Sequence, residues 1–160
     1  MKYNLITILF LLFACCKKQP YIPVTIDCTL SKNIDTLKQL LPGSWIWLQE
    51  ERYVRTPEGA KLMYLTPKTE GYTLKMVFRN DSAFSYKNNI LDSVYKYNVV
   101  KLRIISGTNF PEDEDPVLVF YTLSTGLRSY HVPIKGCNNY LVKQFQYVSS
   151  IAGETIWKKE

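Results

Sequence analysis

Histidine is almost absent from this chain of 160 residues, which contains it once, as His131. The sequence has no H-E-x-x-H, G-x-S-x-G or P-loop spacing, and its four cysteines form no C-x-x-C pair. These absences exclude the common signatures of zinc sites, redox-active thiols and nucleophilic hydrolases. A lone imidazole also lacks the nucleophile and the orienting partner that acid–base catalysis requires. We therefore predict that the protein is not an enzyme and uses neither a metal nor a cofactor.

The chain also lacks an apolar run long enough to span a bilayer as a helix. The stretch Leu5–Ala14 is about half of the ~20 residues that a transmembrane helix needs, and it is typical of the hydrophobic part of a signal peptide. Leu12–Cys15 (L-F-A-C) resembles the lipobox of bacterial lipoproteins, although Phe13 is bulkier than the usual residue there. The resemblance implies that Cys15 receives lipid, or Cys16 in a poorer alignment. An ordinary cleaved signal peptide with incidental cysteines is the alternative.

This export signal divides the chain into three parts. We expect a lipoprotein signal peptide at residues 1–14, a lipidated tether at residues 15–30 and one domain at residues 31–160. The acyl chains would anchor that domain to a membrane of the bacterial cell envelope, since each buried methylene contributes about 0.8 kcal/mol. The net charge of +6 does not indicate nucleic-acid binding, because the basic residues are scattered instead of forming a stripe.

Two further cysteines lie far apart in the chain, at positions 28 and 137. An envelope compartment permits disulfides. A bond between Cys28 and Cys137 would close a loop of about 110 residues and stabilise the fold by roughly 4 kcal/mol through lost chain entropy. We therefore predict this disulfide, and the alternative is that both residues are buried free thiols.

The domain begins with a short helical pattern and continues with strands. Ser31–Asn33 supplies a cap, and Ile34, Leu37 and Leu41 then recur at helical spacing. Pro42 stops the helix. Beyond it the hydrophobic period changes to two, with turn residues every eight to twelve positions, which is typical of a β-sandwich or β-barrel.

The alternating segments number about eight to ten. The clearest are Tyr72–Arg79 and Ser82–Lys87, which we expect to form a hairpin around Asn80-Asp81. The stretch Ile90–Ile105 is predicted as two strands that meet near Tyr97. The other predicted strands are Trp45–Val54, Ala60–Leu65, Val117–Leu123, Leu127–Ile134, Tyr140–Val148 and Glu154–Lys159.

Several short motifs stand in the order of a known family. A short helix precedes the G-x-W of Gly43–Trp45, which resembles the opening of lipocalins. The further series resembles the lipocalin-like domain of small bacterial envelope lipoproteins, and it consists of Trp45-Ile46-Trp47, Thr66-Pro67, Gly71-Tyr72, Phe78 and Tyr86-Lys87-Asn88. The resemblance covers roughly residues 40–89 and the terminal W-K-K. It implies an all-β fold, an antiparallel up-and-down β-barrel with a short N-terminal helix.

The resemblance also implies functional positions. In lipocalins a basic residue of the last strand packs over the G-x-W tryptophan, so we expect Lys158 to lie over Trp45. A barrel of about eight strands can enclose one small apolar ligand. The candidate lining is Trp47, Leu74, Met76, Phe84, Tyr86 and Tyr97.

Two functions are compatible with this reading. We expect a membrane-anchored lipoprotein that binds a small apolar or amphipathic ligand, or a protein partner in the envelope. The alternative is a filled barrel that serves as a structural or protein-interaction module of the envelope without a small-molecule ligand, because the same apolar residues are needed to fill a core.

Overall fold

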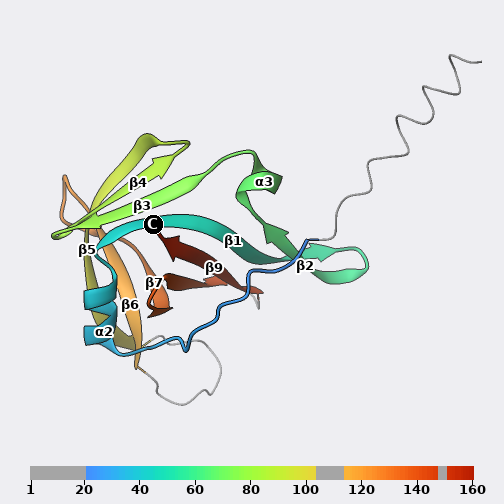
Figure 1. The fold of residues 1–160 in the computed structure, drawn as a ribbon, viewed down its shortest axis with the longest axis horizontal. Helices are drawn as coiled ribbons and strands as arrows, with labels where there is room; N and C mark the ends of the chain where they lie inside the picture. Colours follow the sequence, from blue (N-terminus) through green and yellow to red (C-terminus); the bar gives the residue numbers. More distant parts are fainter. Residues whose placement is uncertain (1–20, 104–113, 148–150) are drawn as a thin grey trace, which may run out of the picture.

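The computed structural model describes residues 21–103, 114–147 and 151–160 of the chain. The elements within these ranges are α2 (Ile34–Leu40), β1 (Gly43–Thr56), β2 (Gly59–Leu65), α3 (Pro67–Glu70), β3 (Leu74–Arg79), β4 (Ser82–Lys87), β5 (Ile90–Arg103), β6 (Glu114–Thr122), β7 (Arg128–Cys137), β8 (Tyr140–Tyr147) and β9 (Ile151–Lys159). The strands are antiparallel and form one curved sheet (Figure 1).

The sheet closes on itself. Its strands are hydrogen-bonded in the order β2-β1-β3-β4-β5-β6-β7-β8-β9, and β9 pairs again with β1. Eight strands therefore form a closed barrel, and β2 extends outside it, paired with the second half of β1 from Glu50 to Thr56. This architecture confirms the predicted antiparallel up-and-down β-barrel.

Several segments differ from the predicted elements, among them β5, β6 and α3. β5 is one strand and not two, because its pairing with β4 reaches Lys96 and its pairing with β6 already begins at Tyr95. The two ladders overlap, so no break is needed between them. β6 begins at Glu114 instead of Val117, since its first residues pair with the end of β5. The short helix α3 was not predicted; Thr66 caps its start and Gly71, at φ 71°, ends it.

The helix α2 covers one end of the barrel. Its cap is Asn33, whose side-chain oxygen accepts a hydrogen bond from Thr36 N at 2.9 Å. Leu37 and Leu41 are fully buried and belong to the core, as the helical spacing predicts. Gly136 lets the helix approach β7 closely, because a Cβ at this position would lie 2.6 Å from the Leu40 side chain. We call the opposite end of the barrel the far end.

Strand parity separates an inner wall from an outer wall. Successive side chains of a strand point to opposite faces, and the core residues of directly paired strands share the inner face. The buried residues on this inner wall are Trp45, Trp47, Met76, Phe78, Ala83, Val99, Leu118, Phe120, Val132, Ile134, Leu141 and Trp157. The predicted β3–β4 hairpin is confirmed, with Asn80 at φ 55° in its turn.

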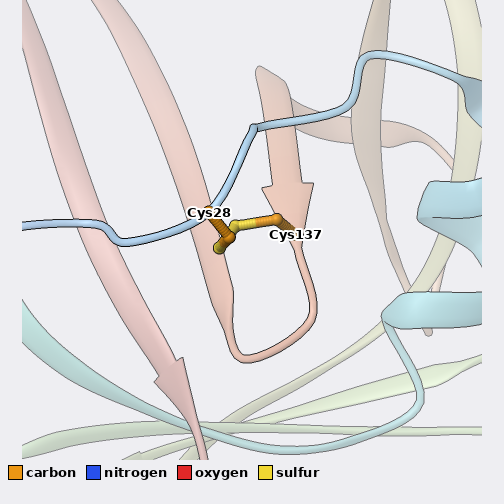
Figure 2. The surroundings of a disulfide bond; sticks show 2 residues. All are labelled: Cys28 and Cys137. Atoms are coloured by element: carbon orange, nitrogen blue, oxygen red, sulfur yellow. A yellow bond between two sulfur atoms is a disulfide. The ribbon is translucent and has the colours of Figure 1, made fainter.

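The segment before α2, residues 21–31, lies along the outer wall, and we call it the strap. Cys28 in the strap and Cys137 at the end of β7 are joined by a disulfide (Figure 2). Ser31 exchanges two backbone hydrogen bonds with Gly136, at 2.8 and 3.0 Å. Upstream, Val24 N donates to the Gln49 side-chain oxygen at 2.8 Å, and the Tyr21 hydroxyl donates to the same atom.

The strap explains why part of the outer wall is buried. Gln49, Ile156 and Val142 are neighbours across β1, β9 and β8 on the outer face, and their exposed fractions are 0%, 5% and 0%. The described part of the expected tether therefore packs against the domain. The expected signal peptide and the lipidated position at Cys15 or Cys16 lie outside the described residues. No helix in the described ranges is both long and apolar enough to cross a bilayer.

Candidate functional site

Four of the six expected lining residues lie on the inner wall. Trp47 and Met76 are buried members of the core cluster, and Leu74 and Tyr97 pack against it. Trp47 also stacks on Tyr72, with ring centroids 5.6 Å apart. These residues come from β1, β3, β5 and the segment before β3, so they line the inside from several directions.

The expectation for Phe84 and Tyr86 is wrong. The two-residue turn of the hairpin pairs Phe78 with Ala83 and Val77 with Phe84. Because directly paired residues share a face, Ala83 joins Phe78 inside and Phe84 points outward. Tyr86 pairs with Lys75 on the same outer face. The inner positions of β4 therefore carry the small side chains of Ala83 and Ser85.

A lysine reaches into the centre of the barrel. Lys143 of β8 shares the inner face with Leu141, and the residue is only 5% exposed. Its Nζ lies 4.3 Å from the Trp157 ring centroid and 5.9 Å from that of Phe120. The same Nζ is 3.6 Å from Met76 Sδ. Contacts with β9, β6 and β3 place the amine between opposing parts of the wall.

This amine has no carboxylate partner within the described residues. Its only polar contact there is the thioether of Met76, a weak acceptor. Burial disfavours the charged form and lowers the pKa of Lys143 to about 7. Burying an ammonium without a counter-charge costs free energy. An anion placed beside this amine would therefore stabilise its charged form strongly.

Three further polar groups near Lys143 are buried without a hydrogen-bond partner in the described structure. They are the indole Nε1 atoms of Trp47 and Trp157 and the hydroxyl of Thr155. Thr155 is paired directly with Lys143, and Trp157 is paired directly with Trp47. Directly paired side chains are about 5 Å apart at Cβ, so these groups form one continuous patch across β8, β9 and β1. We call these four residues the donor patch.

Other charged side chains on the inner face lie toward the two ends. Glu50 is paired with Thr155 near the far end, and its carboxylate accepts from Arg52 Nη2 at 2.6 Å. Lys87 lies at the far end over Tyr72, with Nζ 4.3 Å from the ring centroid. Glu50 therefore lies beside Thr155 of the donor patch, and its carboxylate is paired with Arg52.

The tryptophan of the G-x-W motif is held by Lys159 and not by Lys158. Lys159 Nζ lies 5.4 Å from the Trp45 ring centroid and donates to Leu40 O at 2.8 Å. The reason is strand parity: Trp157 points inward, so Lys159 does too, and Lys158 is exposed. Trp45 is also fixed by its Nε1, which donates to Leu41 O at 2.7 Å.

The described structure has few other candidate catalytic, metal-binding or ligand-binding features. His131 is on the outer face of β7 and is largely exposed. Its partial desolvation, together with the positive charge of Arg128, lowers its pKa. No group of three or more His, Cys, Asp or Glu side chains within the described ranges could hold a metal ion. A surface pocket of about 370 Å³ lies where the strap, α2 and the β7–β8 turn meet, with Thr36, Gln39 and Asn138 in its lining.

Sequence reasoning missed the donor patch, although a signal existed. In β8, Lys143 comes two residues after Leu141, so the two side chains lie on the same face of the strand. A lysine on the same face as a buried leucine is unusual, but apolar Val142 on the other face of β8 weakened this signal. No family model, curated protein or solved structure matches the chain. The interpretation of the site depends on its own geometry and on the sequence motifs.

Proposed function

We propose that the protein is a non-enzymatic, lipid-anchored envelope lipoprotein with a lipocalin-like barrel that binds a small amphipathic molecule. The observation that carries this proposal is Lys143, a cationic side chain placed at the barrel centre with no counter-charge among the described residues. A barrel that only has to be filled is better served by apolar side chains, because a buried polar group costs free energy unless it is paired.

The packing at the barrel centre also favours a ligand. Lys143 and Met76 meet there, and both side chains are unbranched with several rotatable bonds. They can swing aside at lower cost than branched residues. On the inner face of β4 the side chains are small, those of Ala83 and Ser85. The interior can therefore adapt to a guest molecule.

The far end of the barrel has an apolar rim. Because β4 and β6 run away from α2, the β4–β5 and β6–β7 turns lie at this end. Exposed apolar residues lie in or directly beside these turns, namely Ile90 (73%), Leu91 (51%), Leu123 (55%) and Leu127 (69%). Such a rim suits the passage of a molecule with an apolar part.

The anchor would hold this rim near the membrane. Tyr21 donates to Gln49, and its ring packs at a tilt against Tyr64 of β2, which is paired with the half of β1 that leads to the far end. The few residues between Cys15 and Tyr21 span at most about 20 Å when extended. A ligand could thus pass between the bilayer and the barrel over a short distance.

Native mass spectrometry tests this proposal. The full chain is purified from the envelope of the producing cells in a non-ionic detergent, and its mass is measured before and after denaturation. We expect a non-covalent adduct that denaturation removes, and a diacylglycerol-derived mass on Cys15 that it does not remove. A native mass that holds only the covalent lipid would favour the alternative, a filled structural or protein-interaction module of the envelope. An unlipidated cytosolic chain would contradict the anchor.

A further inference from the structure

The donor patch has a consistent chemical character. Lys143 Nζ and the two indole N–H groups of Trp47 and Trp157 are donors, and the Thr155 hydroxyl can donate as well as accept. The partner missing from this arrangement is an acceptor. Each of the three groups without a partner is buried, so each loses a hydrogen bond to water without a replacement. A ligand that supplies several acceptor atoms at one place removes several of these costs together.

We propose that the ligand is an amphipathic carboxylic acid, bound with its carboxylate on the donor patch and its apolar part toward the far end. This inference rests on the proposed binding function and specifies its ligand class. A carboxylate supplies two oxygens with about four acceptor positions. Its negative charge pairs with the ammonium of Lys143, which has no other ion-pair partner in the described structure.

Other headgroups fit the site less well. A cationic headgroup would be repelled by the ammonium form of Lys143 and would meet two indole N–H donors, neither of which can accept a hydrogen bond. A neutral alcohol satisfies one or two donors but leaves the lysine unpaired. A phosphate carries up to two charges and three or more oxygens, and its desolvation beside Trp157 and Phe120 would cost more than that of a monoanion. A monocarboxylate balances the single charge of Lys143.

Binding of a carboxylate is coupled to a proton. Without ligand, Lys143 loses its proton near neutral pH because of burial, and an anion beside it favours the charged form. The affinity for a carboxylate is therefore highest between the pKa of the ligand acid and about pH 7. Above that range it falls by about tenfold per pH unit, since the free protein must first take up a proton.

Tyrosines and charged side chains also face the interior, and burial raises the pKa of Tyr97 and of Tyr130. These groups are Tyr72, Tyr95, Tyr97 and Tyr130, together with Glu50, Arg52, Lys87, Lys101 and Lys159. Among them, the Glu50 carboxylate is paired with Arg52. The comparison with Lys143→Met therefore decides whether the profile between about pH 6 and 9 belongs to Lys143.

Matched ligand pairs test the inference. The full chain in non-ionic detergent is titrated with straight-chain carboxylates of increasing length and with the alcohols of equal length, and tryptophan fluorescence reports occupancy through Trp47 and Trp157. The variants are Lys143→Met, which keeps the length and shape of the side chain, and Lys158→Met as an exposed control on the neighbouring strand. We expect a carboxylate to bind about tenfold or more tightly than its alcohol at pH 7.

The outcomes separate this inference from the proposed function. In Lys143→Met the preference for the acid and its pH dependence should disappear while the alcohol still binds, and Lys158→Met should match the wild type. If acid and alcohol bind the wild type equally, or if Lys143→Met keeps the preference, the carboxylate assignment is wrong and the binding function stands. If neither series binds, both proposals fail. Far-ultraviolet circular dichroism of each variant confirms that the barrel has folded.

Discussion

Lys159 on the last strand lies over the ring of Trp45 on the first, with Nζ 5.4 Å from the ring centroid. The same amine donates to the carbonyl of Leu40, one of the last residues of α2, at 2.8 Å. One side chain thus joins the two edges of the barrel seam to the helix that covers its end. A cation over an indole face and a charged hydrogen bond at a helix C-terminus both favour this arrangement.

We predict that Lys159→Met destabilises the fold by about 2 kcal/mol. The substitution removes the contact with Trp45 and leaves the Leu40 carbonyl without its donor. Urea unfolding followed by tryptophan fluorescence measures the change in the free energy of unfolding. Lys158→Met is the matched control, because that side chain is exposed and should change stability by no more than about 0.5 kcal/mol. Equal effects of the two substitutions would contradict the conclusion that Lys159, and not Lys158, packs over Trp45.

The stability of the ligand-free protein should rise with pH above neutrality. The folded chain loses the Lys143 proton near pH 7, whereas an unfolded chain keeps it up to about 10.5. Between these values the unfolded state binds more protons, so the free energy of unfolding increases by at most about 1.4 kcal/mol per pH unit. Below pH 7 both the folded and the unfolded chain hold the Lys143 proton, so Lys143 no longer makes the free energy of unfolding depend on pH.

Urea midpoints measured from about pH 7.5 to 9.5 check this dependence. The upper limit avoids the tyrosines, since burial raises the pKa of Tyr97 above its ordinary value of 10.0 and would reverse the slope at higher pH. In Lys143→Met the slope should vanish and the protein should be more stable at pH 7, because a buried charge has been removed. A wild-type slope that persists in this variant would assign the effect to another group.

Loss of the disulfide should weaken the strap and the whole fold. Cys28 and Cys137 are separated by 109 positions, so their bond restricts the unfolded chain strongly. We predict that the double substitution Cys28→Ser and Cys137→Ser lowers the free energy of unfolding by roughly 4 kcal/mol. Hydrogen exchange should increase at the amide of Ser31, which pairs with Gly136, more than at amides within the sheet. Unchanged exchange there would mean that the strap is held by its other contacts alone.

The two aromatic residues of the β3–β4 hairpin should respond differently to truncation. Phe78 is 1% exposed on the inner wall and packs edge-on against Tyr97, at 4.9 Å between ring centroids. We predict that Phe78→Ala costs about 3 to 5 kcal/mol through loss of buried area and the cavity that remains. Phe84→Ala, on the outer face, should cost about 1 kcal/mol. Unfolding curves of the pair therefore test which face of β4 is inside.

Much of the barrel was predictable from local patterns. The Asn80-Asp81 turn and the alternation on either side predict the β3–β4 hairpin, although β3 begins at Leu74 and not at Tyr72, and the cap at Asn33 predicts α2. These features depend on residues close together in sequence. The division of β5 was predicted wrongly because its continuity depends on two partner strands, β4 and β6, that pair with different halves of it.

The inner and outer faces were harder to predict. Both faces of β8 and β9 carry apolar residues, since the strap covers Val142 and Ile156 on the outside while Leu141 and Trp157 fill the inside. Hydrophobic alternation therefore did not show that Lys143 points inward. On β4 the larger side chain, Phe84, lies outside and the smaller one, Ala83, lies inside, which reverses the usual expectation from size. Only the register of the sheet decides such cases.

The seam between β1 and β9 joins the beginning of the domain to its last residues. Trp45 has its partner only when Lys159 has been synthesised, and Ser31 finds Gly136 only after β7 exists. A growing or partly translocated chain thus cannot complete its ring, and long-range pairing of this kind is slow. Closure therefore requires a complete β9, so a chain cut within this strand would lose the circular sheet instead of one strand end.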